Sequence, residues 1–160
     1  MPVQLILDTS AVIVLAKSGL ADLLPPLANR VAIPAEVEHE VRARPGTAPD
    51  AAIRLLDEAT WIERLPPLSI AAHATLGPGE LAVIQWAQQR PGWVAVLDDL
   101  AARTLAFRSS LRVTGCVGLV QRAKVEGLIG VARPAIDALR AAGLYMSDPF
   151  YVRALADVGE

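Results

Sequence analysis

Val3-Gln-Leu-Ile-Leu-Asp8-Thr9-Ser10, near the start of the chain, is the segment around which we expect the rest of the fold to be arranged. It is a short apolar run without alternation of polar and apolar residues, and it ends on a carboxylate and two hydroxyls. Such a run predicts a strand that is buried on both faces, and the apolar segment after the polar break predicts a helix. Because ligands bind at the carboxyl ends of the strands in open α/β sheets, we expect chemistry at Asp8.

Strands and helices are predicted to alternate along the rest of the chain. Apolar runs predict strands over 31–33, 61–65, 93–97 and 111–113. Helical spacing predicts helices over 11–17, 35–44, 50–59, 80–89, 100–109, 116–124, 135–142 and 150–158, and a helical turn over 20–23. This alternation is typical of a mostly parallel sheet with right-handed crossovers. We therefore expect an α/β fold, a three-layer α/β/α sandwich, as a single domain over residues 1–160.

Composition limits the classes of function. The chain has 160 residues, of which 53% are hydrophobic, so it can bury a substantial core. A net charge of -2 and an aromatic content of 4% exclude a protein that holds nucleic acid mainly by a broad basic surface or by extensive base stacking. We expect no membrane span and no signal peptide. The single cysteine, Cys116, favours a cytoplasmic location.

Acidic side chains fall where the predicted strands end and helices begin. Asp8 and the pair Asp98-Asp99 follow the two most apolar strands. Glu80 begins one helix, and Glu40 lies in the helix after the strand over 31–33. Carboxylates brought together at one sheet edge repel one another unless a cation compensates them. Oxygen ligands without histidine or cysteine select Mg²⁺ or Mn²⁺, which support phosphodiester hydrolysis, so the pattern predicts metal-dependent phosphoryl chemistry.

Each of these residues also has a plainer interpretation. Asp8, Glu80 and Asp98 are equally suited to capping the helices that follow them. Glu40 fits a solvated helix face.

A concentration of basic residues follows the last acids: Arg103, Arg108 and Arg112, then Arg122 and Lys124. It either holds RNA phosphates beside the metal or forms ordinary solvated helix faces.

Four motifs resemble, in order along the chain, the acidic motifs of PIN-domain nucleases: Ile6-Leu-Asp8-Thr-Ser10, Val37-Glu-His-Glu40, Gly79-Glu80-Leu-Ala-Val-Ile-Gln-Trp-Ala87 and Leu97-Asp98-Asp99-Leu-Ala-Ala-Arg103. Two later stretches look like the VapC-related subgroup of predicted nucleic-acid-binding proteins: Val113-Thr-Gly115-Cys-Val-Gly118-Leu and Val158-Gly-Glu160. The resemblance covers nearly the whole chain.

The resemblance implies a PIN-like sandwich with the activity of a metal-dependent endoribonuclease. Such proteins are often the toxin half of a toxin-antitoxin pair and frequently form homodimers, so RNA, an antitoxin and a second copy are the expected partners. Carried over by position, the four metal-binding and catalytic acids are Asp8, Glu40, Glu80 and Asp99. Ser10 would support the metal site through its hydroxyl. Asp98 is either an additional ligand or a partner of the ligands.

The main rival is a non-catalytic PIN-like module that binds RNA or a protein partner and keeps its acids as helix caps. A haloacid-dehalogenase-like phosphatase is disfavoured, because its motif needs a second aspartate where this chain has Ser10. We expect a dimer face on the apolar first helices.

Overall fold

The computed structural model describes residues 3–44 and 50–160. Within these ranges, five strands form one parallel sheet with the order β3-β2-β1-β4-β5. The strands are β1 (Val3–Leu7), β2 (Ala28–Pro34), β3 (Ile62–Leu65), β4 (Val94–Val96) and β5 (Arg112–Thr114). The stretch that opens the chain therefore becomes the central strand. Its side chains from Leu5 to Leu7 are almost completely buried, as expected for a strand covered on both faces.

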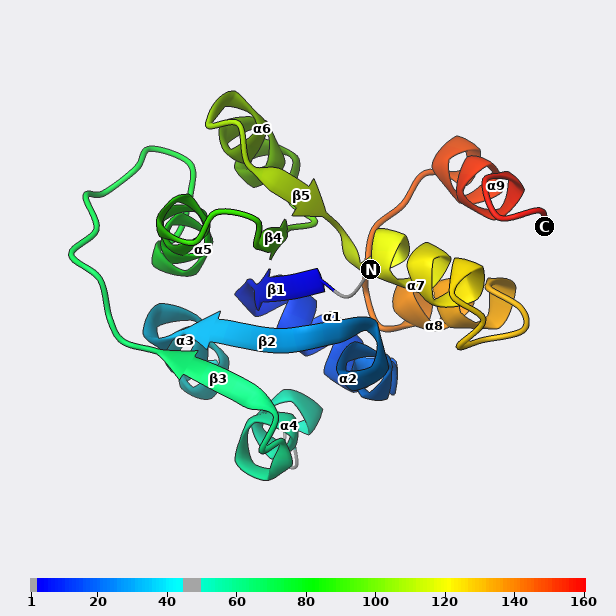
Figure 1. Ribbon diagram of the computed structural model, residues 1–160, viewed down its shortest axis with the longest axis horizontal. Coiled ribbons are helices and arrows are strands. Elements are labelled where there is room, and N and C mark those ends of the chain that lie inside the picture. The colour runs from blue at the N-terminus through cyan, green and yellow to red at the C-terminus, as the bar shows by residue number, and fades with distance from the viewer. Residues whose placement is uncertain (1–2, 45–49) are drawn as a thin grey trace.

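Helices connect the strands and cover the sheet. They are α1 (Thr9–Lys17), the short 3-10 helix η1 (Ala21–Leu23), α2 (Leu24–Leu27), α3 (Ala35–Ala43), α4 (Ala51–Glu58), α5 (Pro78–Gln89), α6 (Leu100–Arg108), α7 (Cys116–Val125), α8 (Arg133–Ala141) and α9 (Asp148–Ala156). Figure 1 shows their order around the sheet.

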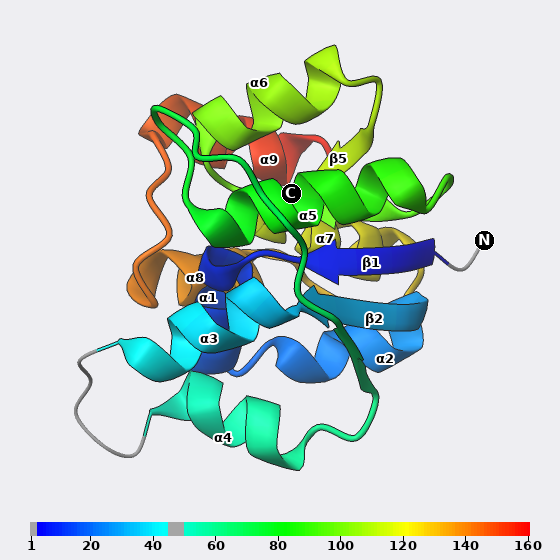
Figure 2. The same ribbon diagram turned by 90° about the vertical axis from the view of Figure 1, so that its left-hand side faces the viewer.

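The helices form two layers. Helix α5 packs on β1, β2 and β4, whereas α1 contacts α4 and α7. Figure 2 shows the sheet from another side, with β5 and α6 at the top, β1 and β2 further down, and α4 at the bottom. The two layers follow from right-handed crossovers, because the connections that run outward to β3 and those that return towards β5 must lie on opposite faces. The predicted α/β/α sandwich with a parallel sheet is confirmed, and in the described residues every strand pair is parallel.

Helix boundaries differ from the prediction where proline is involved. The helical turn predicted over 20–23 was expected to end before Pro25, but Pro25 and Pro26 both lie in the first turn of a further helix, α2. Proline is tolerated there because the first backbone N–H groups of a helix have no intrahelical acceptor. Helix α9 likewise begins at Asp148, two residues earlier than predicted, with Ser147 as its N-cap and Pro149 in the first turn.

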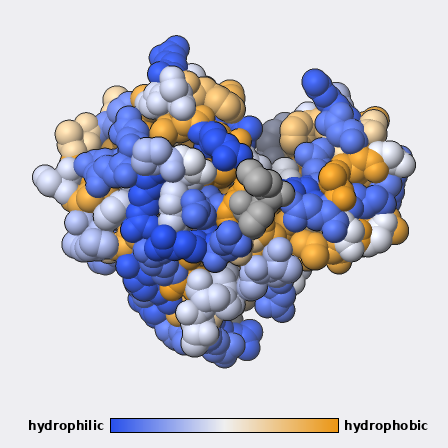
Figure 3. Space-filling model, viewed as in Figure 1, coloured by the Kyte–Doolittle hydropathy of each residue, from blue (hydrophilic) through white to orange (hydrophobic). Residues whose placement is uncertain are grey.

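The exposed apolar side chains do not lie where the dimer face was expected. Helices α1 and α2, which the structure describes completely, carry none of the large exposed hydrophobic residues. These lie instead on α6, near the end of α7, and around α9: Leu100, Phe107, Val125, Leu128, Val131, Tyr145, Phe150 and Val152. The first helices are apolar because they pack into the core. Figure 3 shows hydrophobic residues scattered among hydrophilic ones on one face, with several on the part that contains α9.

No single helix in the described ranges is long and apolar enough to cross a membrane. One bent pair, Thr9–Lys17 with Ala21–Leu27, passes that test by length and composition when taken together, with an angle of 107° between its halves. Val12, Leu15, Leu24 and Leu27 of this pair are buried in the core.

Candidate active site

The carboxyl ends of β1 and β4 bring two aspartates together. The strands are neighbours, with Leu7 opposite Val96. Asp8 follows β1 directly, and its N–H donates to the carbonyl of Val96 at 3.3 Å. Asp98 comes two residues after β4. The negative charge of Asp98 acts on Asp8, whose side chain is almost completely buried at 1% exposure.

Each aspartate uses one oxygen to cap a helix and leaves the other without a partner. Asp8 Oδ1 accepts from the N–H of Ala11 at 2.8 Å, at the start of α1, and Asp98 Oδ1 accepts from the N–H of Cys116 at 2.9 Å, at the start of α7. Asp8 Oδ2 and Asp98 Oδ2 are buried and have no hydrogen-bond partner among the described residues. A buried carboxylate oxygen without a donor is costly, so these two atoms call for a cation or a donor from outside the chain.

Glu40 holds three helices together. It lies on α3 and is half-buried; its Oε2 accepts from the Thr9 hydroxyl on α1, and its Oε1 accepts from the Gly79 N–H on α5 at 2.7 Å. A Cβ atom at position 79 would lie 2.6 Å from Glu40 Oε2 and 2.8 Å from Thr9 Oγ1. Glycine is therefore required for this close approach. The solvated helix face considered for Glu40 is not what the structure has.

Thr9, rather than Ser10, supplies the hydroxyl on this side of the site. Ser10 is exposed, and Thr9 donates to Glu40. Sequence analysis missed Thr9 and Gly79. One signal was present: Gly79 follows a proline inside the first turn of a helix, where glycine is unfavourable unless another group approaches the backbone closely.

Glu80 and Asp99 lie at the starts of the two helices on the other face of the sheet. Glu80 Oε2 accepts from the N–H of Gly77 at 3.3 Å, and Asp99 Oδ1 accepts from the N–H of Ala102 at 2.9 Å. Asp99 is exposed and Glu80 is half-buried. Burial raises the pKa of Glu80, and the nearby charges of Asp99 and Glu40 raise it further.

The acids act on one another electrostatically. Burial, the largest cause, raises the pKa of Asp8 to about 8; the Ala11 N–H opposes this shift, and the charges of Asp98, Glu80 and Glu40 add to it. Four acidic side chains therefore lie near one another: Asp8, Glu40, Glu80 and Asp98. Asp99 lies near the same group, because its charge acts on Glu80. An uncompensated concentration of carboxylates at one sheet edge favours the binding of positive charge.

The donor set fits a hard cation at Asp8 and Asp98. In residues 3–44 and 50–160, no three acidic, histidine or cysteine side chains are placed so that they could hold one metal ion together. Mg²⁺, however, keeps several waters and is usually bound by one or two carboxylates together with substrate phosphates. Two unpartnered carboxylate oxygens from adjacent strands match that requirement, and oxygen ligands favour Mg²⁺ or Mn²⁺ over zinc.

Of the three arginines expected to contact phosphates, Arg103 lies beside the acids. Its Nη1 donates to the carbonyl of Leu97 at 2.9 Å, and a Cβ atom at Gly115 would lie 3.1 Å from that nitrogen and 2.6 Å from Asp98 Oδ1. Arg108 ends α6, which starts at the site and runs away from it. Arg112 begins β5 and is therefore at the amino edge of the sheet, opposite the acids.

Comparison with known proteins gives one match. A family model described as DUF3368, a PIN domain, matches residues 4–160, nearly the whole chain. Neither the curated proteins nor the solved structures gave a match. PIN domains have a nuclease-type fold and generally use divalent metals. The chain thus belongs to the DUF3368 family of PIN domains.

Proposed function

We propose that this PIN domain is an Mg²⁺- or Mn²⁺-dependent endoribonuclease that hydrolyses phosphodiester bonds in RNA. One observation carries the proposal: Asp8 Oδ2 and Asp98 Oδ2 are buried at the ends of adjacent strands, without a hydrogen-bond partner in the described part of the chain. Buried carboxylate oxygens without a hydrogen-bond donor destabilise the protein unless something positive lies beside them. A divalent ion supplies that charge.

The residues of the site divide the work. Asp8 and Asp98 would hold the ion, and Glu80 and Asp99 add negative charge beside it. A bound Mg²⁺ or Mn²⁺ activates a water for attack and stabilises the charge on the leaving oxygen. Glu40 is a positioning residue, because its Oε1 accepts from Gly79 at the start of α5, which carries Glu80, and its Oε2 accepts from Thr9 on α1, next to Asp8.

Cleavage of a single-stranded RNA by purified protein tests the proposal. We expect cleavage that needs Mg²⁺ or Mn²⁺, that stops with a chelator, and that Asp8→Asn and Asp98→Asn abolish. Asp50→Asn is the matched control, because Asp50 also caps a helix through one oxygen, at the start of α4. If Asp8→Asn and Asp50→Asn cleave RNA equally well, the acids are caps only and the proposal fails.

A non-catalytic module is the second candidate, and the capping contacts favour it. Asp8, Asp98, Asp99 and Glu80 each accept from a backbone N–H at a helix start, which accounts for one oxygen of each side chain without any metal. Calorimetry with Mn²⁺ separates the two candidates. The enzyme requires Mn²⁺ binding that is lost in Asp8→Asn, whereas the module does not.

We further propose that the protein acts in the cytoplasm as the toxin of a toxin-antitoxin pair, as a homodimer that a cognate antitoxin protein inhibits. The subgroup resemblance of Val113–Leu119 supports this role. Induced expression should then arrest growth of the host cell, and Asp8→Asn should relieve the arrest. Light scattering of the purified protein tests the dimer.

A further inference from the structure

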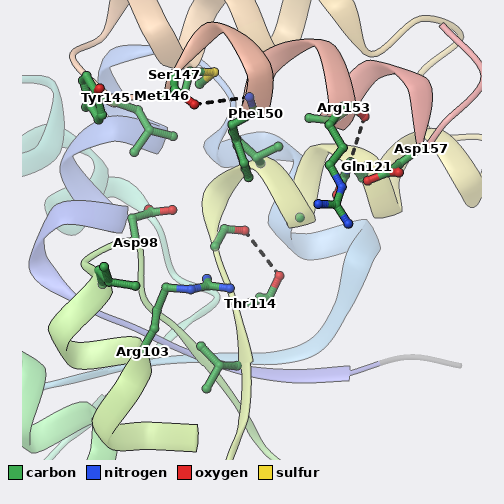
Figure 4. A pocket seen from close by; sticks show the side chains of 17 residues that line it. Asp98, Arg103, Thr114, Gln121, Tyr145, Met146, Ser147, Phe150, Arg153 and Asp157 are labelled. Carbon is green, nitrogen blue, oxygen red and sulfur yellow. Dashed lines mark hydrogen bonds between the residues drawn. The ribbon is translucent and has the colours of Figure 1, made fainter.

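A cavity of about 590 Å³ opens beside the acids. Asp98 and Arg103 lie on one side of it, Thr114 lies between the two sides, and Phe150 and Arg153 of α9 lie on the other side (Figure 4). Figure 3 shows the surface hollowed between the parts of the molecule that contain α6 and α9. The cavity and the candidate metal site share Asp98, so a substrate held at the acids extends into the cavity.

The walls of the cavity carry two arginines, two aspartates (Asp98 and Asp157) and an aromatic ring. Arg103 and Arg153 line it from opposite sides, from α6 and α9. Arg103 uses Nη1 for the carbonyl of Leu97, which leaves other N–H donors of the guanidinium group for a ligand. The ring of Phe150 is 48% exposed and points into the cavity from α9. Asp157 lines the cavity one turn after Arg153.

The wall formed by α9 is held in place at both ends. Asp148, at its start, pairs with Arg140 of α8 at 2.6 Å, and the Tyr151 hydroxyl donates to Asp137 of α8 at 2.7 Å. Beyond its end, the Glu160 side chain accepts from the N–H of Ala132 at 2.6 Å. The backbone that presents Phe150 and Arg153 is therefore fixed before any ligand binds, which lowers the entropic cost of binding.

We propose that this cavity binds one unpaired nucleotide of the RNA next to the scissile phosphate, with the base stacked on Phe150 and a phosphate held by Arg153 and Arg103. The inference rests on the proposed ribonuclease function. The volume lies within the roughly 300–1,000 Å³ of small-molecule sites. Bases in a duplex are stacked inside the helix and cannot enter a recess, whereas the bases of single strands can be turned out onto aromatic side chains. The cavity therefore makes the enzyme select single-stranded RNA.

Fluorescence anisotropy with a labelled single-stranded RNA of about twelve nucleotides tests the subsite, with the same sequence as a duplex for comparison. All variants carry Asp8→Asn, so that the RNA is bound without being cut. Phe150→Ala should weaken single-strand binding about 5- to 150-fold, as expected for the loss of one base–aromatic stack. Arg153→Gln should weaken it too and reduce the dependence of log Kd on log salt by about 0.7.

Two controls keep the test sharp. Val152→Ala changes an exposed residue of α9 that does not line the cavity and should leave binding unchanged. Phe150→Leu keeps an apolar side chain without a ring and should bind as weakly as Phe150→Ala.

The subsite proposal is overturned if Phe150→Ala binds like Val152→Ala, or if the duplex binds as tightly as the single strand. The former result would leave the cavity to a protein segment. If the wild type fails to cleave RNA but Phe150 and Arg153 still control single-strand binding, the nuclease proposal fails and the subsite stands.

Discussion

Asp8→Asn should change how the stability of the metal-free protein depends on pH. The pKa of Asp8 is about 8 in the folded protein and 3.8 when unperturbed, so the folded state binds this proton more tightly than the unfolded state does. Stability is therefore highest while Asp8 is protonated and falls as pH rises from about 4 to about 8. At about 1.4 kcal/mol per pKa unit, the wild type should lose about 4 kcal/mol between pH values of about 5 and 9 through this group alone.

Asparagine keeps an oxygen that accepts from the Ala11 N–H, but it cannot ionise. The stability of Asp8→Asn should therefore lack the decrease with rising pH that Asp8 causes in the wild type. The assay is urea unfolding in the presence of a chelator, followed by tryptophan fluorescence, at several pH values. Asp50→Asn should keep the pH profile of the wild type. Saturating Mn²⁺ should restore stability at high pH in the wild type and in Asp50→Asn but not in Asp8→Asn, since ligands that bind the folded state stabilise it. Parallel pH profiles for wild type and Asp8→Asn would refute the burial of an ionisable Asp8.

The contacts of Glu40 lead to two further predictions. Gly79→Ala places a methyl group 2.6 Å from Glu40 Oε2 and should lower the free energy of unfolding by about 1–3 kcal/mol. Gly130→Ala is the control and should change this free energy little, because a Cβ atom at position 130 would have no neighbouring atom within 4 Å. Equal urea midpoints for the two variants would contradict the prediction. Thr9→Val removes the hydroxyl that donates to Glu40 and should lower the free energy of unfolding by about 1–2 kcal/mol in the same assay. Thr9→Ser keeps a hydroxyl for this hydrogen bond and should therefore retain most of the stability.

The sequence contained enough to predict the sheet and the edge where the acids lie. The apolar runs ending at Leu7 and Leu97 are continuous because both strands are covered by helices on two faces, and a carboxylate after each run places charge at the carboxyl edge. The cap at Asp8 was also predictable from its residue type. The prediction that Asp98 caps the helix after it was wrong, because Asp99 is the N-cap of α6 and Asp98 accepts from Cys116 at the start of α7 instead.

The parts of the site that depend on contacts between distant segments were not predictable. Glu40 looks like a surface residue until α1 and α5 bring Thr9 and Gly79 to it, from 31 and 39 residues away. The different positions of Asp98 and Asp99 depend on where β4 ends and on which helix each residue caps. Arg112 was grouped with Arg103 by proximity in sequence, but it begins a strand and Arg103 follows one, so they lie at opposite edges.

The double use of the aspartates, as helix caps and as charges facing the site, restricts what evolution can do with them. In the nuclease that we propose, alanine at position 8 or 98 would remove a metal ligand and would also leave a helix N-terminus unsatisfied. A relative without the proposed activity would still need a short polar side chain at both positions, and asparagine or serine would meet that need. An aspartate at such a position in a relative is consequently weak evidence for catalysis, because helix capping alone is enough to retain it. An asparagine there keeps the cap but removes the negative charge, as expected for a relative that has lost the catalytic activity.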